Sequence, residues 1–410
     1  MWVGTIAPSS MPDGVPPPEE APLLVLGAGY AGLTLAEEVR RRSKGTIPVR
    51  VVDRHPVHVL RTQLYEIGRL AGAGGDLARW TVPLDRAFSR TGVEFVEGTV
   101  EEIDLGHHRV RLAGREESYR ALAICLGNVA SFYGVPGALE HTHSVYRLSG
   151  AQRFAEAVLA TERRSADLPG ERRPRVVVVG GGSTGTEVAA EIATTDWGRL
   201  VGGPVRPPDV TLVTGSLPFL AGFPPRLIDH ARRVLRDVGV TVIPGVNVSQ
   251  VEPGRVHLED GTVLVADPVL WCAGMEAPPP VRALPVPHGR GGRLATEPTL
   301  ELPGHPGVFA VGDVVEFRDP NSGLLAPSTA QAALSEARLA ARNLVARLHG
   351  GRLEEYQYRE HGVIVALGVR RGAGSIGGIS LWGSPARLLK QLVEREYSRA
   401  AGRGEPPGVL

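Results

Sequence analysis

The sequence of 410 residues predicts an α/β fold in which one strand–turn–helix–strand pattern occurs twice. Two glycine-rich turns, Gly27–Gly32 and Gly180–Gly185, each follow a short apolar run and precede a stretch with helical spacing of apolar residues. Short apolar runs of this kind are typical of buried parallel strands. A third apolar run, Gly307–Val311, precedes a long helical stretch that opens within Pro327–Gln331 and runs to Leu348, and Ser328 with Gln331 fits a capping box at its start.

The first copy has the parts of a dinucleotide-binding unit. The run Leu23–Leu26 leads into Gly-Ala-Gly-Tyr-Ala-Gly, and the next strand, Val49–Val52, ends in Asp53. The first glycine allows a tight turn, the second lets a pyrophosphate approach the backbone, and the third lets the helix pack closely. The N-terminus of the helix attracts the phosphates, and Asp53 is placed to bind ribose hydroxyls. The residues expected to contact this dinucleotide are Gly27, Gly29, Tyr30, Ala31, Gly32, Asp53 and Arg54.

The second copy begins 153 residues later, a spacing typical of separate domains. Its first strand is Val176–Val179, and its second strand, Val210–Val213, is followed by Thr214. Two such units predict two bound dinucleotides, and the economical pairing is FAD with a nicotinamide cofactor. The expected contacts in the second unit are Gly180, Gly182, Ser183, Thr184, Gly185 and Thr214.

These motifs resemble the two-dinucleotide-binding flavoprotein superfamily of pyridine-nucleotide oxidoreductases, and within it the type II NADH:quinone oxidoreductase group. The resemblance covers roughly residues 21–370. It implies an FAD-binding domain (21–148 and 292–348) of Rossmann type, split by an inserted NAD(P)H-binding domain (149–291). The remaining parts are a flexible arm (1–20) and a C-terminal tail (349–410) on the acceptor side or at an oligomer contact. It further implies FAD contacts from Gly127, Gly312, Asp313 and Ala330.

The resemblance also implies three catalytic candidates. Glu187 is expected in the first turn of its helix, beside the nicotinamide ribose or carboxamide. Gln331 and Glu336 lie in the segment that corresponds to the quinone-site helix, where Ser335-Glu336 replaces a Gln-Gln pair and an altered acceptor is implied. Glu66, which also replaces a glutamine, faces the flavin edge or lies at the surface.

Two departures from the family pattern limit the reactions and cofactors that the chain can use. Cys125 and Cys272 are the only cysteines, and neither has the Cys-x4-Cys partner of the disulfide reductases, so no redox disulfide is expected. Both are expected to be buried apolar residues. Thr214 stands where NADH-using relatives carry an acid, which leaves both NADH and NADPH open.

Composition excludes several classes of partner. The 45 basic and 44 acidic residues nearly cancel, so no nucleic-acid partner is expected. No apolar run approaches the roughly 20 residues of a membrane span. The tail from Leu381 onward has a net charge of +2, and Pro385 is expected to interrupt it, so no stable membrane anchoring is expected. No metal site is expected, a cytoplasmic location fits the cysteine content, and a homodimer is left open.

The predicted function is that of an FAD-dependent NAD(P)H oxidoreductase that passes hydride to the flavin and then to a quinone or another small organic acceptor. Two alternatives stay open. One is a flavoenzyme of secondary metabolism that oxidises or reduces one small molecule, and the other is a redox-sensing flavoprotein without steady turnover. The sequence does not identify the acceptor, the nicotinamide preference or the physiological direction.

Overall fold

The computed structural model describes residues 18–167, 173–217 and 219–405, which form two compact units. Unit 1 contains the chain up to Pro56, residues 88–127 and residues 278–356. Unit 2 contains residues 57–87, 128–277 and the chain from Gln357 onward. Most of the predicted arm, 1–17, lies outside the described residues. The assignment of one nucleotide to each predicted domain stays a prediction.

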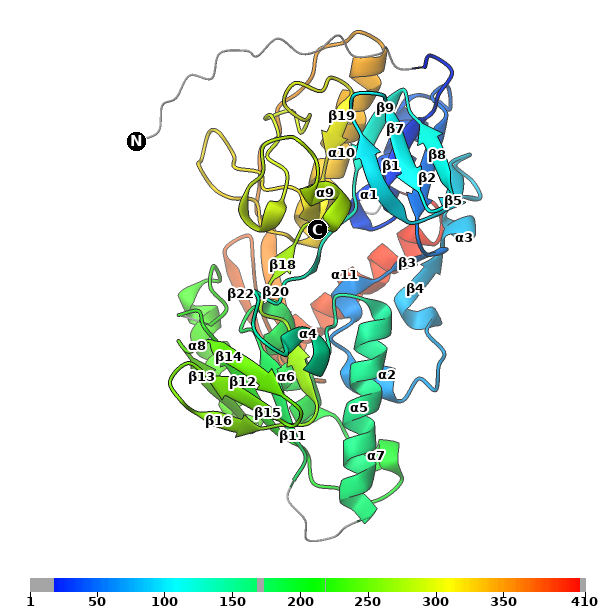
Figure 1. Cartoon of the computed structure of the whole chain (residues 1–410). Helices are drawn as coiled ribbons and strands as arrows, with labels where there is room; N and C mark the ends of the chain where they lie inside the picture. Colours follow the sequence, from blue (N-terminus) through cyan, green and yellow to red (C-terminus); the bar gives the residue numbers. More distant parts are fainter. Residues whose placement is uncertain (1–17, 168–172, 218, 406–410) are drawn as a thin grey trace. The chain divides into compact units, whose positions relative to one another are not determined.

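Unit 1 is built on a five-stranded parallel sheet with the strand order β19-β9-β1-β2-β5. The long helix α10 packs along α1, as Figure 1 shows beside the labelled strands. The elements are β1 (Leu23–Leu26), α1 (Tyr30–Arg42), β2 (Val49–Asp53), β5 (Glu94–Glu97), β9 (Ala121–Ile124), β19 (Val308–Ala310) and α10 (Ala330–Leu348). Strand β1 is completely apolar and buried because it lies in the middle of this sheet.

Shorter elements complete unit 1. A three-stranded antiparallel sheet follows β5 in the chain. Two short helices precede β19, and one follows it. These elements are β6 (Val100–Asp104), β7 (Arg109–Leu112), β8 (Arg115–Ser118), α9 (Pro279–Arg282), η3 (Arg290–Gly292) and η4 (Gly312–Val314); α3 (Leu84–Phe88) ends where the chain enters unit 1.

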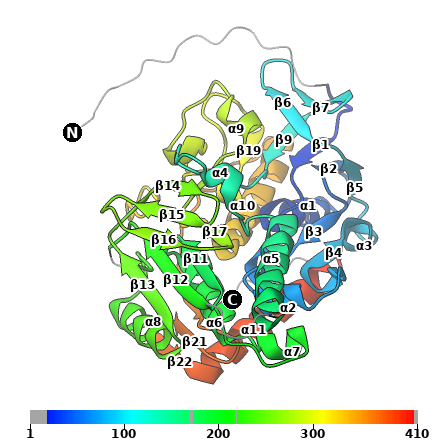
Figure 2. The same cartoon turned by 60° about the horizontal axis from the view of Figure 1, so that its bottom comes forward.

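Unit 2 repeats the plan with a four-stranded parallel sheet in the order β13-β12-β11-β17. Figure 2 shows α8 beside β13 and near the β21–β22 hairpin. The main elements are α5 (Leu148–Asp167), β11 (Arg175–Val179), α6 (Ser183–Thr194), α7 (Trp197–Val201), β12 (Asp209–Thr214), α8 (Pro225–Asp237), β13 (Val240–Pro244) and β17 (Val269–Trp271).

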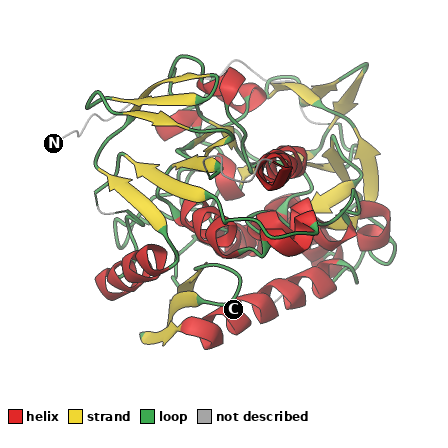
Figure 3. Ribbon diagram, turned by 90° about the horizontal axis from the view of Figure 1, so that it is seen from below, coloured by secondary structure: helices red, strands yellow, loops and turns green. Residues whose placement is uncertain are grey.

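Four small sheets and the C-terminal helix complete unit 2. Figure 3 distinguishes these strands (yellow) from the helices (red). They comprise β3 (Val57–Val59), η1 (Arg61–Gln63), α2 (Ile67–Ala71), η2 (Ala78–Trp80), β4 (Thr81–Pro83), β10 (Val129–Ala130), α4 (Ala138–His141), β14 (Val248–Glu252), β15 (Arg255–Leu258), β16 (Val263–Val265), β18 (Met275–Glu276), β20 (Gly362–Ala366), β21 (Gly372–Ile376), β22 (Ile379–Trp382) and α11 (Gly383–Ala401). Strand β20 packs on α6, so the tail belongs to the core of unit 2.

Two details of the predicted helices are wrong. Helix α10 begins at Ala330, one residue later than a Ser328 cap implies. Its N-cap is Thr329, whose hydroxyl accepts a hydrogen bond from the Ala332 N–H, and Ser328 instead accepts one from Arg293. Pro385 does not interrupt the tail. It lies in the first turn of α11, where a proline costs little because the first N–H groups of a helix have no partner within the helix.

Candidate functional site

The first glycine turn has the geometry of a phosphate cradle. Gly27 has φ +98°, and a Cβ there would lie 2.5 Å from the Cys125 carbonyl oxygen. A Cβ on Gly32 would overlap the carbonyl oxygen of Gly27, so helix α1 packs directly against the turn. Gly29, the N-cap of α1, faces open space and has no side chain to cap the helix. The turn therefore fits a dinucleotide pyrophosphate at a helix N-terminus.

Asp53 lies beside this cradle at the end of β2. Its carboxylate accepts hydrogen bonds from the N–H groups of Ala28 (2.8 Å) and His55 (3.0 Å). Tyr30 and Ala31 are the first two residues of α1, while Arg54 is exposed. The carboxylate is thus held next to the turn, where an adenosine ribose would lie.

The turn at Gly312-Asp313 lies against the start of α1. Gly312 has φ +78°, and a Cβ on it would lie 3.1 Å from the Ala31 Cβ and 3.6 Å from the Ala333 Cβ. The Gly312 N–H donates to the Glu336 carboxyl group at 2.7 Å. The starts of α1 and α10 and the Gly312-Asp313 turn therefore form one site in unit 1. Of the other predicted contacts here, Gly127 (φ +68°) follows β9, and Ala330 and Gln331 open α10.

Glu336 is the catalytic candidate with the most perturbed environment in this site. Its side chain is buried, and burial raises its pKa to about 8, although the hydrogen bond from the Gly312 N–H opposes the shift. The carboxyl group therefore stays mostly protonated at neutral pH. A protonated carboxyl can donate one hydrogen bond while its other oxygen accepts from Gly312, as an amide side chain would.

The turn in unit 2 repeats these features. Gly180 has φ +116°, and a Cβ on it would lie 2.5 Å from the Cys272 carbonyl group. A Cβ on Gly185 would overlap the Gly180 carbonyl oxygen, and Gly182 caps α6 facing open space. Ser183 and Thr184 are the first residues of α6 and are half-buried. This turn also fits a pyrophosphate.

Thr214 occupies the position that Asp53 has in unit 1. Each follows the residue whose carbonyl accepts from the first glycine, at 2.7 Å for Gly27 and 2.8 Å for Gly180. Thr214 is buried, its side chain lies against Gly181, and its hydroxyl accepts from the Ser216 N–H at 3.3 Å. The second site therefore has a neutral group where the first has a carboxylate.

Within unit 2, the Glu187 side chain contacts the C-terminal tail. Because α6 begins at Ser183, Glu187 opens the second turn, and its expected position in the first turn is wrong by one residue. Its carboxylate accepts from the Ala366 N–H at 2.9 Å and lies 3.2 Å from the Lys390 ammonium. Its predicted contact with the nicotinamide stays a prediction.

Lys390 is the centre of a buried polar cluster that the sequence did not predict. Its ammonium also lies 3.0 Å from Glu394 and 4.8 Å from the centre of the Tyr65 ring. Burial by itself lowers the pKa of Lys390, but Glu187 and Glu394 raise it above its ordinary value, so the ammonium stays charged. One signal was present in the sequence, since Lys390 and Lys44 are the only lysines among 45 basic residues.

The cluster continues through Arg387 to Glu66. Arg387 donates to the Tyr65 hydroxyl at 3.0 Å and lies 3.6 Å from Glu66, which Arg79 also binds at 3.0 Å. Glu66 is completely buried in unit 2, so the surface alternative for this residue is wrong and only the other one, the flavin edge, stays a prediction. The tail thus contributes two cations that neutralise acids from earlier parts of the chain.

The two cysteines occupy equivalent positions beneath the two glycine turns. Cys125 N donates to the Leu26 carbonyl at 2.8 Å, and Cys272 N donates to the Val179 carbonyl at 2.7 Å. Both are free and buried, as expected, and burial raises the pKa of each thiol well above its ordinary value. Neither thiol is poised to react, because the thiolate is the reactive form.

Replacing both cysteines with alanine should leave flavin reduction within a few-fold of wild type, because packing is their only role here. Anaerobic stopped-flow absorbance measures that rate, with a thermal melt to show that the variant is folded. If the rate of flavin reduction falls several hundred-fold in a folded Cys125→Ala, Cys272→Ala protein, a thiol takes part in the reaction.

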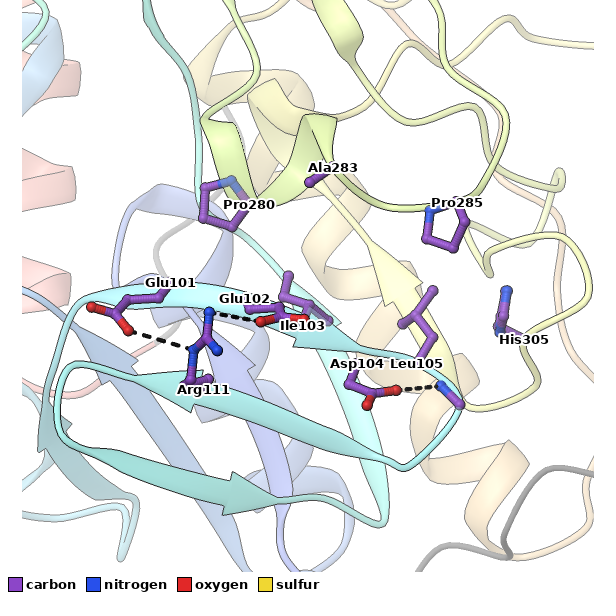
Figure 4. A pocket seen from close by; sticks show the side chains of 11 residues that line it. Glu101, Glu102, Ile103, Asp104, Leu105, Arg111, Pro280, Ala283, Pro285 and His305 are labelled. Atoms are coloured by element: carbon purple, nitrogen blue, oxygen red, sulfur yellow. Dashed lines mark hydrogen bonds and ion pairs between the residues drawn. The ribbon is translucent and has the colours of Figure 1, made fainter.

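A separate pocket of unit 1 lies between β6 and the segment around α9 (Figure 4). Its charged groups already have partners: Arg111 binds Glu101 and Glu102 at 3.6 and 2.7 Å, and Asp104 accepts from the Gly106 N–H at 3.0 Å. None of the predicted site residues lines it. It is therefore distinct from the dinucleotide cradle.

Comparisons with known proteins agree with this arrangement. The model of the family described as pyridine nucleotide-disulphide oxidoreductase matches residues 21–337. The chain belongs to this family. It is similar to demethylphylloquinone reductase NdbB of Synechocystis (29% identity, covering 90% of each chain). It is also similar to the type II NADH:quinone oxidoreductase of Staphylococcus aureus (26%, covering 91% of this chain and 94% of the relative).

A solved structure shows the same fold. NDH2 of Plasmodium falciparum in complex with NADH has a TM-score of 0.78 at 13% identity, covering 94% of this chain and 97% of the other. The predicted α/β fold with two dinucleotide-binding domains and the predicted family resemblance are both confirmed. This flavoprotein is an FAD-dependent oxidoreductase that uses a nicotinamide cofactor.

Proposed function

We propose that this flavoprotein is an NAD(P)H:quinone oxidoreductase. The observation that carries the proposal is the placement of both cysteines as buried, unreactive packing residues, in a chain whose family is described as pyridine nucleotide-disulphide oxidoreductase. Electrons must then leave the flavin directly for a small acceptor. Quinones are the acceptors named for the two relatives described above, each of which aligns over nine-tenths of the chain or more.

The residues of the chain would bind and orient the cofactors, and the flavin would supply the hydride chemistry. We assign FAD to the cradle of Gly27–Gly32, Asp53 and Gly312-Asp313, and the nicotinamide dinucleotide to the turn at Gly180–Gly185. The N-terminus of α10 would stabilise negative charge on the reduced flavin. Gln331 and the protonated Glu336 are the polar groups that α10 would offer near that cofactor.

Anaerobic stopped-flow mixing tests the proposal. NADH or NADPH should bleach the flavin band within seconds, and menadione should then restore it much faster than oxygen or an aromatic disulfide does. Reoxidation by quinone no faster than by oxygen would contradict the proposal. A reduced flavin that persists with every acceptor would favour the redox-sensing alternative.

Discrimination between NADH and NADPH should be weak or should favour NADPH, because buried Thr214 provides no carboxylate for the ribose hydroxyls. Thr214→Asp, which copies Asp53, should shift the preference toward NADH by roughly 1.5–3 kcal/mol, or about tenfold to a hundredfold. The ratio of kcat/KM for the two nucleotides measures this shift. Thr241→Asp, at an exposed position on β13, is the matched control. A wild type that already prefers NADH a thousandfold would contradict the reading.

Among the residues that the structure describes, none of the helices combines the length and apolarity needed to cross a membrane. Leu388 and Leu392 are nevertheless 54% and 51% exposed on α11. With a tail charge of only +2, we expect the protein not to float with anionic liposomes at physiological salt. If most of it floats, and Leu388→Ser with Leu392→Ser abolishes flotation, the tail is a membrane-binding element. A cytoplasmic location and a homodimer stay predictions.

A further inference from the structure

A tight turn in unit 2 holds a tyrosine in a conformation that tyrosine disfavours. The Val135 N–H donates to the Phe132 carbonyl at 2.9 Å, and the two central residues, Tyr133 and Gly134, have φ +52° and +69°. Turns with two positive φ values favour Asn-Gly or Gly-Gly, because a bulky side chain is strained there. Tyr133 is 68% exposed, so burial does little to offset this strain.

The ring lies on the segment that follows β17. The Tyr133 hydroxyl donates to the Ala273 carbonyl at 3.5 Å. A Cβ on Gly274 would overlap the Tyr133 hydroxyl and lie 2.5 Å from its Cζ. Gly274 is not among the residues with positive φ, so space for the ring, and not backbone conformation, explains the glycine. The positive φ of Tyr133 and the missing side chain of Gly274 thus have the same result: an exposed aromatic ring lies against this segment.

The support beneath the ring is rigid. The Ser131 N–H donates to the Gly274 carbonyl at 3.0 Å, and the Trp271 indole donates to the Ser131 carbonyl at 2.8 Å. The Tyr146 hydroxyl donates to the Cys272 carbonyl at 3.1 Å. Side chains and backbone therefore hold both the turn and segment 272–274, between which the Tyr133 hydroxyl makes its hydrogen bond.

This position is next to the glycine turn of the second dinucleotide site. A Cβ on Gly180 would lie 2.7 Å from the Ala273 nitrogen, so segment 272–274 borders the turn directly. Thr214, on the adenosine side, ends β12, whereas the segment follows β17, which lies on the opposite side of β11. A dinucleotide that crosses the carboxyl edge with its adenosine over β12 has its other half over β17.

We propose that Tyr133 is a binding residue for the nicotinamide half of the dinucleotide, and that its exposed ring packs against the planar nicotinamide or its ribose. This inference rests on the proposed function, since it takes the second site as the nicotinamide site. An aromatic ring fixed in advance adds contact area with little loss of side-chain freedom on binding. That benefit accounts for a strained tyrosine in a turn that asparagine would fit better.

Tyr133→Asn tests the inference, because asparagine suits the turn and removes the ring. Calorimetric titration of the oxidised protein with NAD⁺ or NADP⁺ should give a dissociation constant about tenfold higher than wild type. The concentration dependence of anaerobic flavin reduction should show the same rise for the reduced nucleotide. The melting temperature should equal or exceed that of wild type, since strain is removed. Reoxidation of dithionite-reduced enzyme by menadione should be unchanged.

Two further variants separate the ring from its hydroxyl and from the turn. Tyr133→Phe keeps the ring and should bind nucleotide within threefold of wild type. Gly274→Ala leaves Tyr133 in place but displaces its ring, and should reproduce the defect of Tyr133→Asn. A dissociation constant for Tyr133→Asn within twofold of wild type, in protein that nucleotide still reduces, would overturn the inference alone. Wild type that neither nucleotide reduces would overturn the proposed function and the inference with it.

Discussion

Lys390→Met is expected to lower the free energy of unfolding of unit 2 by about 3–5 kcal/mol. The lysine ammonium is the direct cationic partner of Glu187, at 3.2 Å, and also neutralises Glu394, at 3.0 Å. Removing one partner of a buried ion pair leaves the other charge uncompensated in a medium of low dielectric. Methionine keeps most of the volume of the lysine stem, so the loss reports the charge and not a cavity.

Urea denaturation followed by tryptophan fluorescence measures this loss, because Trp80, Trp197, Trp271 and Trp382 all lie in unit 2. Arg395→Met removes an exposed cation from the same helix, α11, and should cost less than 0.5 kcal/mol by the usual behaviour of surface positions. Adding Glu187→Gln to Lys390→Met should recover part of the stability. A loss below about 1 kcal/mol for Lys390→Met would show that the cluster is hydrated and not a buried ion pair.

Glu336→Gln is expected to stabilise unit 1 by about 4 kcal/mol at pH 8 but by no more than about 1 kcal/mol at pH 5. Burial raises the folded-state pKa of Glu336 to about 8, above its ordinary value of 4.5. Between these two values the unfolded chain has lost a proton that the folded chain keeps. Wild-type stability therefore falls as pH rises through this window, and a glutamine, which has no such proton, avoids the loss.

The release of flavin fluorescence during thermal denaturation, measured from pH 5 to pH 8.5, follows this effect. Glu355→Gln removes an exposed acid from the same unit and should show no comparable pH dependence. Glutamine can still accept from the Gly312 N–H, so flavin content should be retained. Equal stabilisation at pH 5 and pH 8 would mean that Glu336 is ionised in the folded protein.

Local pattern was sufficient for the two dinucleotide units and for α10. A Cβ at Gly27, Gly32, Gly180 or Gly185 would collide with the backbone of a neighbouring segment, so each position requires glycine. Such glycines stand close together in the sequence and are recognised there. The 19 residues of α10 follow helical periodicity over their whole length, so its end at Leu348 was predicted correctly and its start to within one residue. Its cap was not, because Ser328 and Thr329 are both good capping residues and only the backbone distinguishes them.

The burial and the partners of the charged residues could not be predicted from the sequence. Glu66 read equally well as a surface residue because an acid is seldom buried without a partner, and its partners Arg79 and Arg387 lie 13 and 321 positions away. Glu187 and Lys390 are likewise 203 positions apart, and only the packing of β20 on α6 and of α11 on β20 joins them. Ion pairs between residues so far apart in the chain leave no pattern in the local sequence. Tyr133 shows the same division, since a tyrosine before a glycine is unremarkable in sequence, and only a positive φ and the missing side chain at Gly274 reveal that the fold holds its ring in place.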